Sequence, residues 1–263
     1  INQCDFCPTY NYWGSWRGKC AKNVVNEIEY LINNYNAKKI IFLDDNATAN
    51  KKRMQEISNI ILDKKINIRL GCLASINTYD KETFELMYKA GFRWIHFGIE
   101  SGSQKVLKNN NKKFNIDYAK QVIKEVKKIG YRVRTSFIFD LPTTTKEEMQ
   151  KTIEFILETE PDEIRGHFLT LRLGTTIYNK LSKEKELPTQ YIHSDKPLLE
   201  SEVYTNSEML EDIDILINSL KDKDYKIVRN VSKWENLEKL RNKEGKIKFL
   251  SFCPSRYGID WEK

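Results

Sequence analysis

A regular alternation between two hydrophobic periods runs through about 170 residues of this chain and constrains its fold more than any other feature. Apolar residues three and four positions apart predict helices, and the short apolar runs between them, rich in β-branched residues, predict strands. The predicted helices cover residues 23–35, 51–63, 80–90, 116–129 and 145–159, and the predicted strands cover residues 39–43, 66–72, 94–99, 133–139 and 164–171. Repeated strand–helix units of this kind indicate an α/β fold with a parallel sheet and right-handed crossovers.

The ends of the predicted helices carry their own signals. Gly91 and Gly130 follow two of them at the position where a chain commonly leaves a helix. Thr145 and Glu148 open another helix with the spacing of a capping box. After about residue 178 the pattern changes, and we expect helices at 208–220 and 234–241 and a strand at 246–252.

Polar side chains follow three of the predicted strands. They are Asp44 and Asp45 after the first strand, Glu100 and Ser101 after the third, and Asp140 after the fourth. The carboxyl ends of parallel strands meet at one edge of a sheet, where binding sites of α/β folds lie. We therefore expect these residues to contribute to a site at that edge.

Composition and cysteine content favour a globular protein over a membrane protein or a disulfide-rich secreted one. The 263 residues are 40% apolar and 31% charged, as in a globular chain, and no stretch approaches the ~18 apolar residues of a membrane span. The first residues have no signal-peptide pattern, and five cysteines without a signal do not suggest a disulfide framework. We expect a cytoplasmic protein without a membrane partner. The net charge of +7, spread along Lys-rich helices, gives only weak support for a nucleic-acid partner.

Cys4 and Cys7 form a Cys-x-x-Cys turn that can present two thiolates to one metal. Zinc sites, iron–sulfur sites and redox sites all use this spacing. Cys20 is a further thiol that could complete a zinc site with a fourth partner, although a free thiol is the simpler interpretation. We interpret Cys72 as a core residue, and Cys253 has no assigned role.

With the segments that follow it, this loop resembles the cluster loop of radical S-adenosylmethionine (radical SAM) enzymes. The chain is most similar to the group whose relatives often carry an N-terminal cobalamin-binding domain. Cys4, Phe6 and Cys7 match the second Cys, the aromatic residue and the third Cys of that family's Cys-x3-Cys-x2-Cys motif. The first Cys would fall immediately before Ile1, so we expect the sequence to be a fragment truncated just after the first cluster Cys.

Four further segments carry the resemblance, in the family's order along the chain. They are residues 42–46 (FLDDN), 97–104 (FGIESGSQ), 134–142 (RTSFIFDLP) and 171–178, which stand in for the family's TPYPGTPLY segment. The resemblance implies that the SAM amino group lies near Asp44 and Asp45. It also implies that Glu100 and Ser101, together with the face carrying Arg134 and Ser136, contact SAM.

The resemblance also implies a fold and a chemistry. We expect an incomplete (β/α)6 partial TIM barrel over residues 1–180, lacking its first strand, with a C-terminal extension over residues 181–263 packed on it. A 4Fe–4S cluster on Cys4, Cys7 and the preceding Cys would reductively cleave SAM to a 5′-deoxyadenosyl radical. The implied partners are a reductant such as a flavodoxin or ferredoxin and a substrate that the sequence does not identify.

The chain departs from the family pattern in two places. The loop after the fifth family strand usually reads GLPGET, whereas residues 140–145 read DLPTTT and lose two glycines and the acid. Residues 171–175 read LRLGT and lack the usual prolines. We expect these departures to alter the substrate side of the site more than the cofactor set.

Other interpretations stay open from the sequence. The chain could belong to a cobalamin-dependent radical SAM methyltransferase, or it could be a zinc-stabilised module that binds nucleic acid or protein. Asp44 and Asp45 could cap the next segment, Glu100 could pair with a basic neighbour such as Arg134, and Ser101 could cap a helix. Arg134 and Ser136 share one face of a strand, but alternation alone does not say which face.

Overall fold

A computed structural model describes residues 3–183, 187, 203–228 and 248–252. The chain divides into two compact units. One unit comprises residues 1–14, 99–117 and 135–263, and we call it the cysteine unit because it contains Cys4 and Cys7. The other comprises residues 15–98 and 118–134, and we call it the β1–β2 unit.

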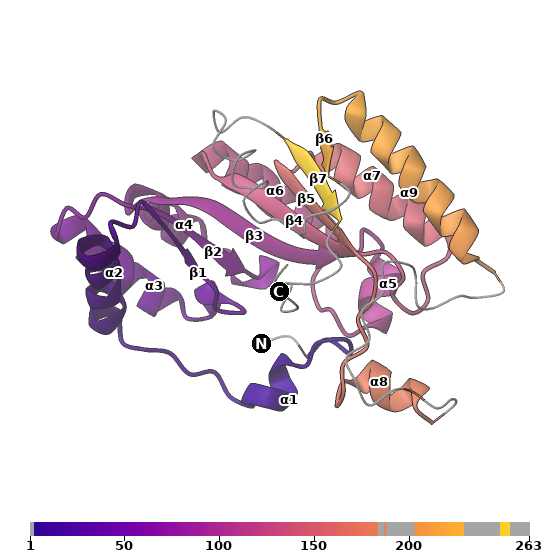
Figure 1. Ribbon diagram of the computed structural model, residues 1–263, viewed down its shortest axis with the longest axis horizontal. Helices are drawn as coiled ribbons and strands as arrows, with labels where there is room; N and C mark the ends of the chain where they lie inside the picture. Colours follow the sequence, from indigo (N-terminus) through magenta and orange to yellow (C-terminus); the bar gives the residue numbers. More distant parts are fainter. Residues whose placement is uncertain (1–2, 184–186, 188–202, 229–247, 253–263) are drawn as a thin grey trace. The chain divides into compact units, whose positions relative to one another are not determined.

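The strands form one seven-stranded sheet in the order β1-β2-β3-β4-β5-β7-β6 (Figure 1). The pairs β1–β2, β2–β3, β5–β7 and β6–β7 are parallel. The strands are β1 (Lys39–Phe42), β2 (Arg69–Ala74), β3 (Phe92–Glu100), β4 (Arg132–Ile138), β5 (Glu163–His167), β6 (Lys226–Val228) and β7 (Phe249–Phe252). The order of the described strands is linear and does not close on itself, which confirms the expected unclosed α/β sheet.

The helices mostly lie where the hydrophobic period placed them. They are α1 (Thr9–Trp13), α2 (Ala21–Tyr35), α3 (Lys51–Asp63), α4 (Lys81–Lys89), α5 (Gln104–Asn109), α6 (Ile116–Ile129), α7 (Lys146–Thr159), α8 (Thr176–Leu181) and α9 (Asn206–Lys221), with 3-10 turns η1 (Ala47–Ala49) and η2 (Ile76–Thr78). The predicted helix at 234–241 lies outside the described residues. Within that description, no helix has the length and apolar character to cross a membrane.

In the β1–β2 unit, α3 packs between α2 and α4. One apolar side of these helices is buried, with Val25, Ile57 and Phe84 fully covered, and Phe84 of α4 stacks on Phe97 of β3 with ring centroids 6.5 Å apart. The core-facing side of β3 is therefore the side of Phe97. Cys72 on β2 is completely buried, as expected for a core residue, and this burial raises the pKa of its thiol.

In the cysteine unit, α7 packs against α9 beside the strands β5, β7 and β6 (Figure 1). Phe137 of β4 meets Phe155 of α7 edge to face, with ring centroids 6.1 Å apart. The predicted C-terminal strand at 246–252 is confirmed as β7, which pairs directly with β5. Residues 249–252 thus extend the sheet itself.

One predicted strand begins too early. Residues 66–72 were expected as a strand, but β2 begins at Arg69 because Lys65 and Ile66 complete the end of α3. Lys65 has a positive φ of 52°, and the N–H of Ile66 bonds to the carbonyl of Ile61 at 3.0 Å. This is the hydrogen-bond pattern of a Schellman motif, so Ile66 is used to close the helix.

Candidate functional site

Cys4 and Cys7 lie on one tight turn, in which the N–H of Cys7 donates to the carbonyl of Cys4 at 3.0 Å. Cys4 is buried and Cys7 is half-buried. The thiol of Cys7 also lies 3.2 Å from the hydroxyl oxygen of Thr9, at the start of α1. The turn therefore presents two sulfur atoms from a fixed backbone.

The turn is held from two sides by segments that are distant in the sequence. The N–H of Asp5 donates to the carbonyl of Asn110 at 3.1 Å, and the N–H of Ile177 donates to the carbonyl of Asp5 at 3.1 Å. The side-chain amide of Asn111 donates to the carbonyl of Gln3 at 2.7 Å. The end of α5 and the start of α8 thus fix the cysteine turn.

Phe6, between the two cysteines, anchors the turn in a hydrophobic cluster. It packs against buried side chains from α5, the loops that follow β4 and β5, and α8. The buried members of this cluster are Val106, Leu141, Leu169, Leu171, Ile177 and Tyr178. Phe6 therefore has a packing role that keeps the two thiols in place, in addition to the cofactor contact implied by the resemblance.

Glu100 ends β3 on the face opposite to Phe97, because side chains alternate along a strand. Its φ is +72°, a left-handed conformation that is uncommon for a residue other than glycine. Such a conformation costs about 1–3 kcal/mol and is concentrated at functional sites. Its carboxylate oxygen lies 3.6 Å from the ammonium of Lys112, so the basic neighbour of Glu100 is Lys112.

Burial and nearby charges set the state of the Cys4 thiol. Burial raises its pKa to about 11, Lys112 opposes this shift, and Glu100 reinforces it. Without a metal, Cys4 is therefore protonated at neutral pH. A metal that binds this sulfur must displace the proton, so metal binding is coupled to proton release.

Ser101 lies inside the protein. Its hydroxyl accepts from the N–H of Ser103 at 3.1 Å and lies 3.3 Å from the hydroxyl of Thr152 on α7. The N–H of Gly102 also donates to Thr152, at 3.0 Å. A Cβ on Gly102 would approach the carbonyl oxygen of Lys151 to 2.6 Å, so only glycine fits here. These contacts make Ser101 a support for Glu100.

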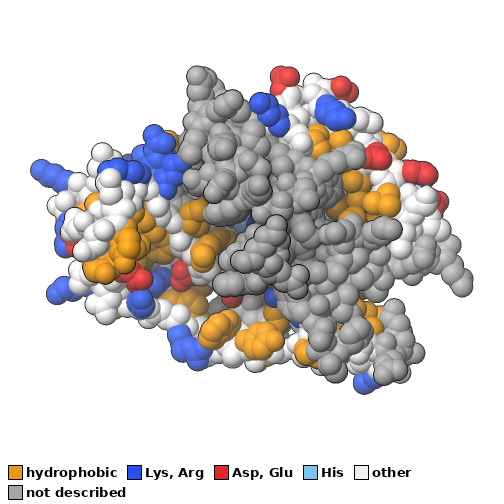
Figure 2. All heavy atoms as spheres, in the orientation of Figure 1, with side chains coloured by type: hydrophobic (Ala, Val, Ile, Leu, Met, Phe, Trp, Pro, Cys, Tyr) orange, Lys and Arg blue, Asp and Glu red, His pale blue; other side chains and the backbone are white. Residues whose placement is uncertain are grey.

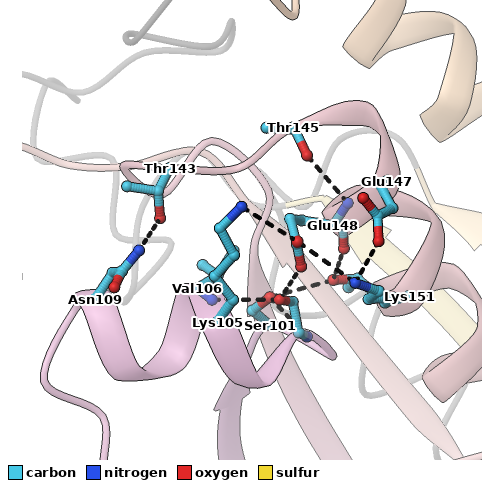
Figure 3. A network of polar contacts seen from close by, with 11 residues as sticks. Ser101, Lys105, Val106, Asn109, Thr143, Thr145, Glu147, Glu148 and Lys151 are labelled. Carbon is cyan, nitrogen blue, oxygen red and sulfur yellow. Dashed lines mark hydrogen bonds and ion pairs between the residues drawn. The ribbon is translucent and has the colours of Figure 1, made fainter.

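The same segment joins α5 to α7 through a buried carboxylate (Figure 3). Ser103 caps α5, and its hydroxyl donates to the carboxylate of Glu148. Lys105 and Lys151 lie 3.7 Å and 3.4 Å from that carboxylate. Only half of the predicted capping box is formed. Thr145 accepts from the N–H of Glu148, but the Glu148 side chain turns to Ser103.

Arg134 and Ser136 lie on the sheet face opposite to the helices, because Phe137 between β4 and α7 fixes the orientation of the strand. Both side chains are buried. The guanidinium of Arg134 lies 4.7 Å from the ring centroid of Trp94, whose ring covers Gly71 of β2. This assigns the face that the sequence left open.

Asp44 and Asp45 follow β1 in the β1–β2 unit and are exposed. The residue that opens the next turn, η1, is Asn46. Its side-chain oxygen accepts from the hydroxyl of Thr48 at 3.0 Å and from the N–H of Ser75 at 3.3 Å. Asn46 therefore ties the ends of β1 and β2 together, which fixes the backbone that carries the two aspartates.

The side chains of this turn provide part of the ligand set that a sulfur-bound metal group needs. Cys4 and Cys7 supply two thiols from one turn, which suits an iron–sulfur cluster or zinc. In the described ranges, no group of three or more His, Cys, Asp or Glu side chains lies close enough to hold a metal ion. Cys20 is exposed at the start of α2, in the other unit. Among the described residues, the turn thus offers two of the three thiolates of the family motif.

Sequence reasoning missed Lys112, Asn110 and Asn111. The only available signal was the run of asparagines at 109–111, because Asn is common where a helix ends in the left-handed conformation. Lys112 itself stands in a Lys-rich stretch and looks like a surface residue. Only the end of α5 brings it to Glu100.

The described residues on the face drawn in Figure 2 form no large basic patch. On the face drawn in Figure 2, Lys and Arg side chains are scattered among other side chains. Hydrophobic side chains show in the region where Figure 1 places α1. On that helix Tyr10, Tyr12 and Trp13 are more than half exposed, so this aromatic segment is available to a partner or a substrate.

Comparison with known families gives a match over more than half of the chain. The model of the Radical SAM superfamily matches residues 1–156. An uncharacterized methyltransferase, PH0819 of Pyrococcus horikoshii, is 32% identical over 176 residues, which are 66% of this chain and 38% of that protein. The anaerobic magnesium-protoporphyrin IX monomethyl ester cyclase of Cereibacter sphaeroides is 24% identical and covers 80% of this chain and 35% of its own length. The chain thus spans less than half the length of these relatives.

Solved structures share the fold at low sequence identity. The radical SAM methyltransferase TsrM from Kitasatospora setae, with cobalamin and a [4Fe–4S] cluster bound, has a TM-score of 0.60 at 16% identity, over 79% of this chain and 44% of that chain. Coproporphyrinogen III oxidase from Escherichia coli has a TM-score of 0.58 at 15% identity, over 94% and 59%. These likenesses confirm the expected partial barrel.

Proposed function

The chain belongs to the radical SAM superfamily, and from this premise we propose that it is the core of an enzyme that cleaves SAM at a 4Fe–4S cluster. The observation that carries the proposal is the turn of the buried Cys4 and the half-buried Cys7. It is bonded to the end of α5, whose Lys112 pairs with Glu100 at the carboxyl end of β3. A thiolate-ligated cluster held by these residues would supply the low-potential electron that cleavage of SAM to a 5′-deoxyadenosyl radical requires.

Cys4 and Cys7 would hold two of the iron atoms, with a third thiolate immediately before Ile1. Backbone hydrogen bonds from Asp5 to the carbonyl of Asn110 and from Ile177 to the carbonyl of Asp5 hold the turn that carries the two sulfur atoms. Phe6 seals one side of the turn through its packing in the hydrophobic cluster. This rigidity supports a cluster that retains its shape when its charge changes.

Glu100 would contact SAM directly, with Ser101 holding the strand end in place. Arg134 and Ser136 contribute buried polar groups on the same face of the sheet. Asp44 and Asp45 would receive the SAM amino group, an assignment that rests on the family resemblance. A carboxylate suits this ligand because SAM carries an ammonium, a sulfonium and ribose hydroxyls.

Anaerobic reconstitution of the complete gene product with iron and sulfide tests this function. We expect a brown protein that converts SAM to 5′-deoxyadenosine and methionine when dithionite supplies electrons. The variant Cys7→Ala should be colourless and inactive. Glu100→Gln should stay brown but bind SAM at least about tenfold more weakly, because one charge-assisted hydrogen bond of about 1.5–3 kcal/mol is lost. A colourless wild-type protein that holds zinc would contradict the proposal and favour a zinc-stabilised binding module.

A second candidate function is cobalamin-dependent methyl transfer. It is favoured by the likeness to PH0819, named as a methyltransferase, and to TsrM, which was solved with cobalamin bound. The complete gene product would then bind cobalamin and form S-adenosylhomocysteine. If only 5′-deoxyadenosine forms when cobalamin is present, the first proposal stands alone.

The partners of the proposed enzyme follow from its chemistry. One-electron reduction of the cluster requires a low-potential donor, and a flavodoxin or ferredoxin meets this need. The substrate stays unassigned, because relatives of this fold act on different molecules.

A further inference from the structure

We propose that Lys112 is a positioning residue of the cluster site: its ammonium holds the carboxylate of Glu100 and places a fixed positive charge beside Cys4. The inference rests on the proposed function, because it takes Cys4 to be a cluster ligand. It adds a residue that neither the sequence nor the family resemblance singled out. It also predicts how the cluster potential responds to a single charge.

The end of α5 places Lys112 rigidly. The N–H of Lys112 donates to the carbonyl of Leu107 at 2.8 Å, and the N–H of Asn111 donates to the carbonyl of Lys108 at 3.1 Å. Asn111 has a positive φ of 55°. Together these features form a Schellman motif, which turns the chain sharply back after the helix. The backbone of Lys112 is therefore as well fixed as the helix itself.

The same turn carries the contacts to the cysteine loop. The carbonyl of Asn110 accepts from the N–H of Asp5, and the side chain of Asn111 donates to the carbonyl of Gln3. Asn110 is itself buried, and its side chain donates to the carbonyl of Pro142 at 3.0 Å. One short segment thus fixes both the loop that bears Cys4 and the lysine that pairs with Glu100.

The ammonium of Lys112 is largely removed from water. It lies 3.6 Å from the Glu100 carboxylate, and the two side chains are only 12% and 13% exposed. It also lies 6.0 Å from the ring centroid of Phe114. Charges in such surroundings interact more strongly than surface pairs, and a carboxylate left there alone would be costly. Lys112 therefore stabilises Glu100 in its strained, left-handed conformation.

The charges around Cys4 are otherwise negative. Asp5 follows Cys4 in the chain, and Glu100 pairs with Lys112 next to the segment that is bonded to this turn. Asp5 has its own partner, because its carboxylate lies 3.5 Å from the ammonium of Lys180. A cluster on Cys4 and Cys7 would gain a further negative charge on reduction. The fixed charge of Lys112 would make that reduction easier.

Redox titration of the reconstituted complete gene product, followed by EPR with dithionite as the reductant, tests this role. We expect Lys112→Met to make one-electron reduction about tenfold less favourable, a shift of about 59 mV toward negative potential. Lys112→Arg, which keeps the charge, should stay close to wild type. Glu100→Gln should shift the potential in the opposite direction. Lys108→Met is the matched control, because it removes an exposed lysine of the same helix and should change nothing.

The outcomes separate this inference from the proposed function. If the wild-type protein forms no cluster, the proposed function fails. If wild type and Lys112→Met both form a cluster of equal potential, only the role of Lys112 fails. A folded Lys112→Met variant that loses the cluster, while Lys112→Arg keeps it, supports the role of the charge. If Lys112→Met does not fold, the comparison of Lys112→Arg with Glu100→Gln decides, and equal potentials in those two variants would overturn the inference.

Discussion

The side-chain nitrogen of Asn109 donates a 3.1 Å hydrogen bond to the hydroxyl of Thr143, across a turn whose geometry calls for glycine. The N–H of Thr144 closes this turn on the carbonyl of Leu141 at 3.0 Å, with Pro142 in the second position. Thr143, in the third position, has a φ of +71°. This is the pattern of a type II turn, in which the third residue is usually glycine. The chain thus keeps the turn of the family's LPG segment with a β-branched residue in it.

Replacing Thr143 with glycine should relieve the strain of this turn. A β-branched residue at positive φ costs about 1–3 kcal/mol, and glycine removes this cost while losing the bond to Asn109 and some chain entropy of about 0.5–1 kcal/mol. Thr143→Ala loses the bond and keeps a Cβ at positive φ. We therefore expect Thr143→Gly to be more stable than Thr143→Ala by about 1 kcal/mol in urea unfolding. The reverse order would show that φ is negative in solution.

The buried carboxylate of Glu148 should matter far more than its exposed neighbour. Glu148 is 2% exposed and binds Ser103, whereas Glu147 is 76% exposed and pairs with Lys151 at 2.7 Å. Glu148→Ala leaves the buried Ser103 hydroxyl without its carboxylate acceptor. It should lower the free energy of unfolding by about 2–3 kcal/mol. Glu147→Ala should change it little, because exposed ion pairs contribute little. Equal effects in thermal unfolding would contradict the burial of Glu148.

Glu160 should make stability depend on acid pH. Hydrogen bonds from Lys223 and Lys248 lower the pKa of its carboxyl to about 2, against about 4.3 for an unfolded Glu. A lowered pKa in the folded state adds stability above the unfolded value and loses it as the pH falls toward the folded value. The stability difference between wild type and Glu160→Gln should therefore be constant near neutral pH and shrink between about pH 4.5 and 2. Urea unfolding across this range measures it, and a difference that persists at pH 2 would contradict the ion pairs.

Most of the fold was predictable because a long helix or strand repeats its apolar spacing often enough to be recognised. The apolar stripe of α6, with Val122, Ile123 and Val126 on one side, gave its bounds correctly. Short elements carry too little period to be seen. The helices α5 and α8 have six residues each, which is fewer than two turns, and neither was predicted.

The candidate site was predictable only where one motif contains its chemistry. Cys4 and Cys7 follow from their spacing, but the contacts of Ser103 and Lys112 depend on residues far away in the sequence. The Glu148 side chain accepts from Ser103 instead of completing the predicted capping box, because a buried hydroxyl needs a hydrogen-bond partner. Lys112 meets Glu100 only through the helix end between them. Local pattern does not contain such tertiary contacts.

Two substitutions of Asn111 separate the backbone of that helix end from its side chain. Asn111→Gly keeps the left-handed conformation and loses only the bond to the carbonyl of Gln3. Asn111→Ala loses the bond and also places a Cβ at a positive φ, which costs about 1–2 kcal/mol. We expect Asn111→Ala to be less stable than Asn111→Gly by about this amount in thermal or urea unfolding.

Both variants should loosen the cysteine turn to the same extent locally, because both lose the bond to Gln3. Hydrogen exchange at the backbone amides of residues 3–7 measures this, and the amide of Asp5, bonded to Asn110, is the sharpest probe. We expect faster exchange in both variants and a smaller loss of global stability in Asn111→Gly than in Asn111→Ala. Unchanged exchange at Asp5 in both variants would show that the bond from Asn111 to Gln3 does not hold the turn that bears Cys4.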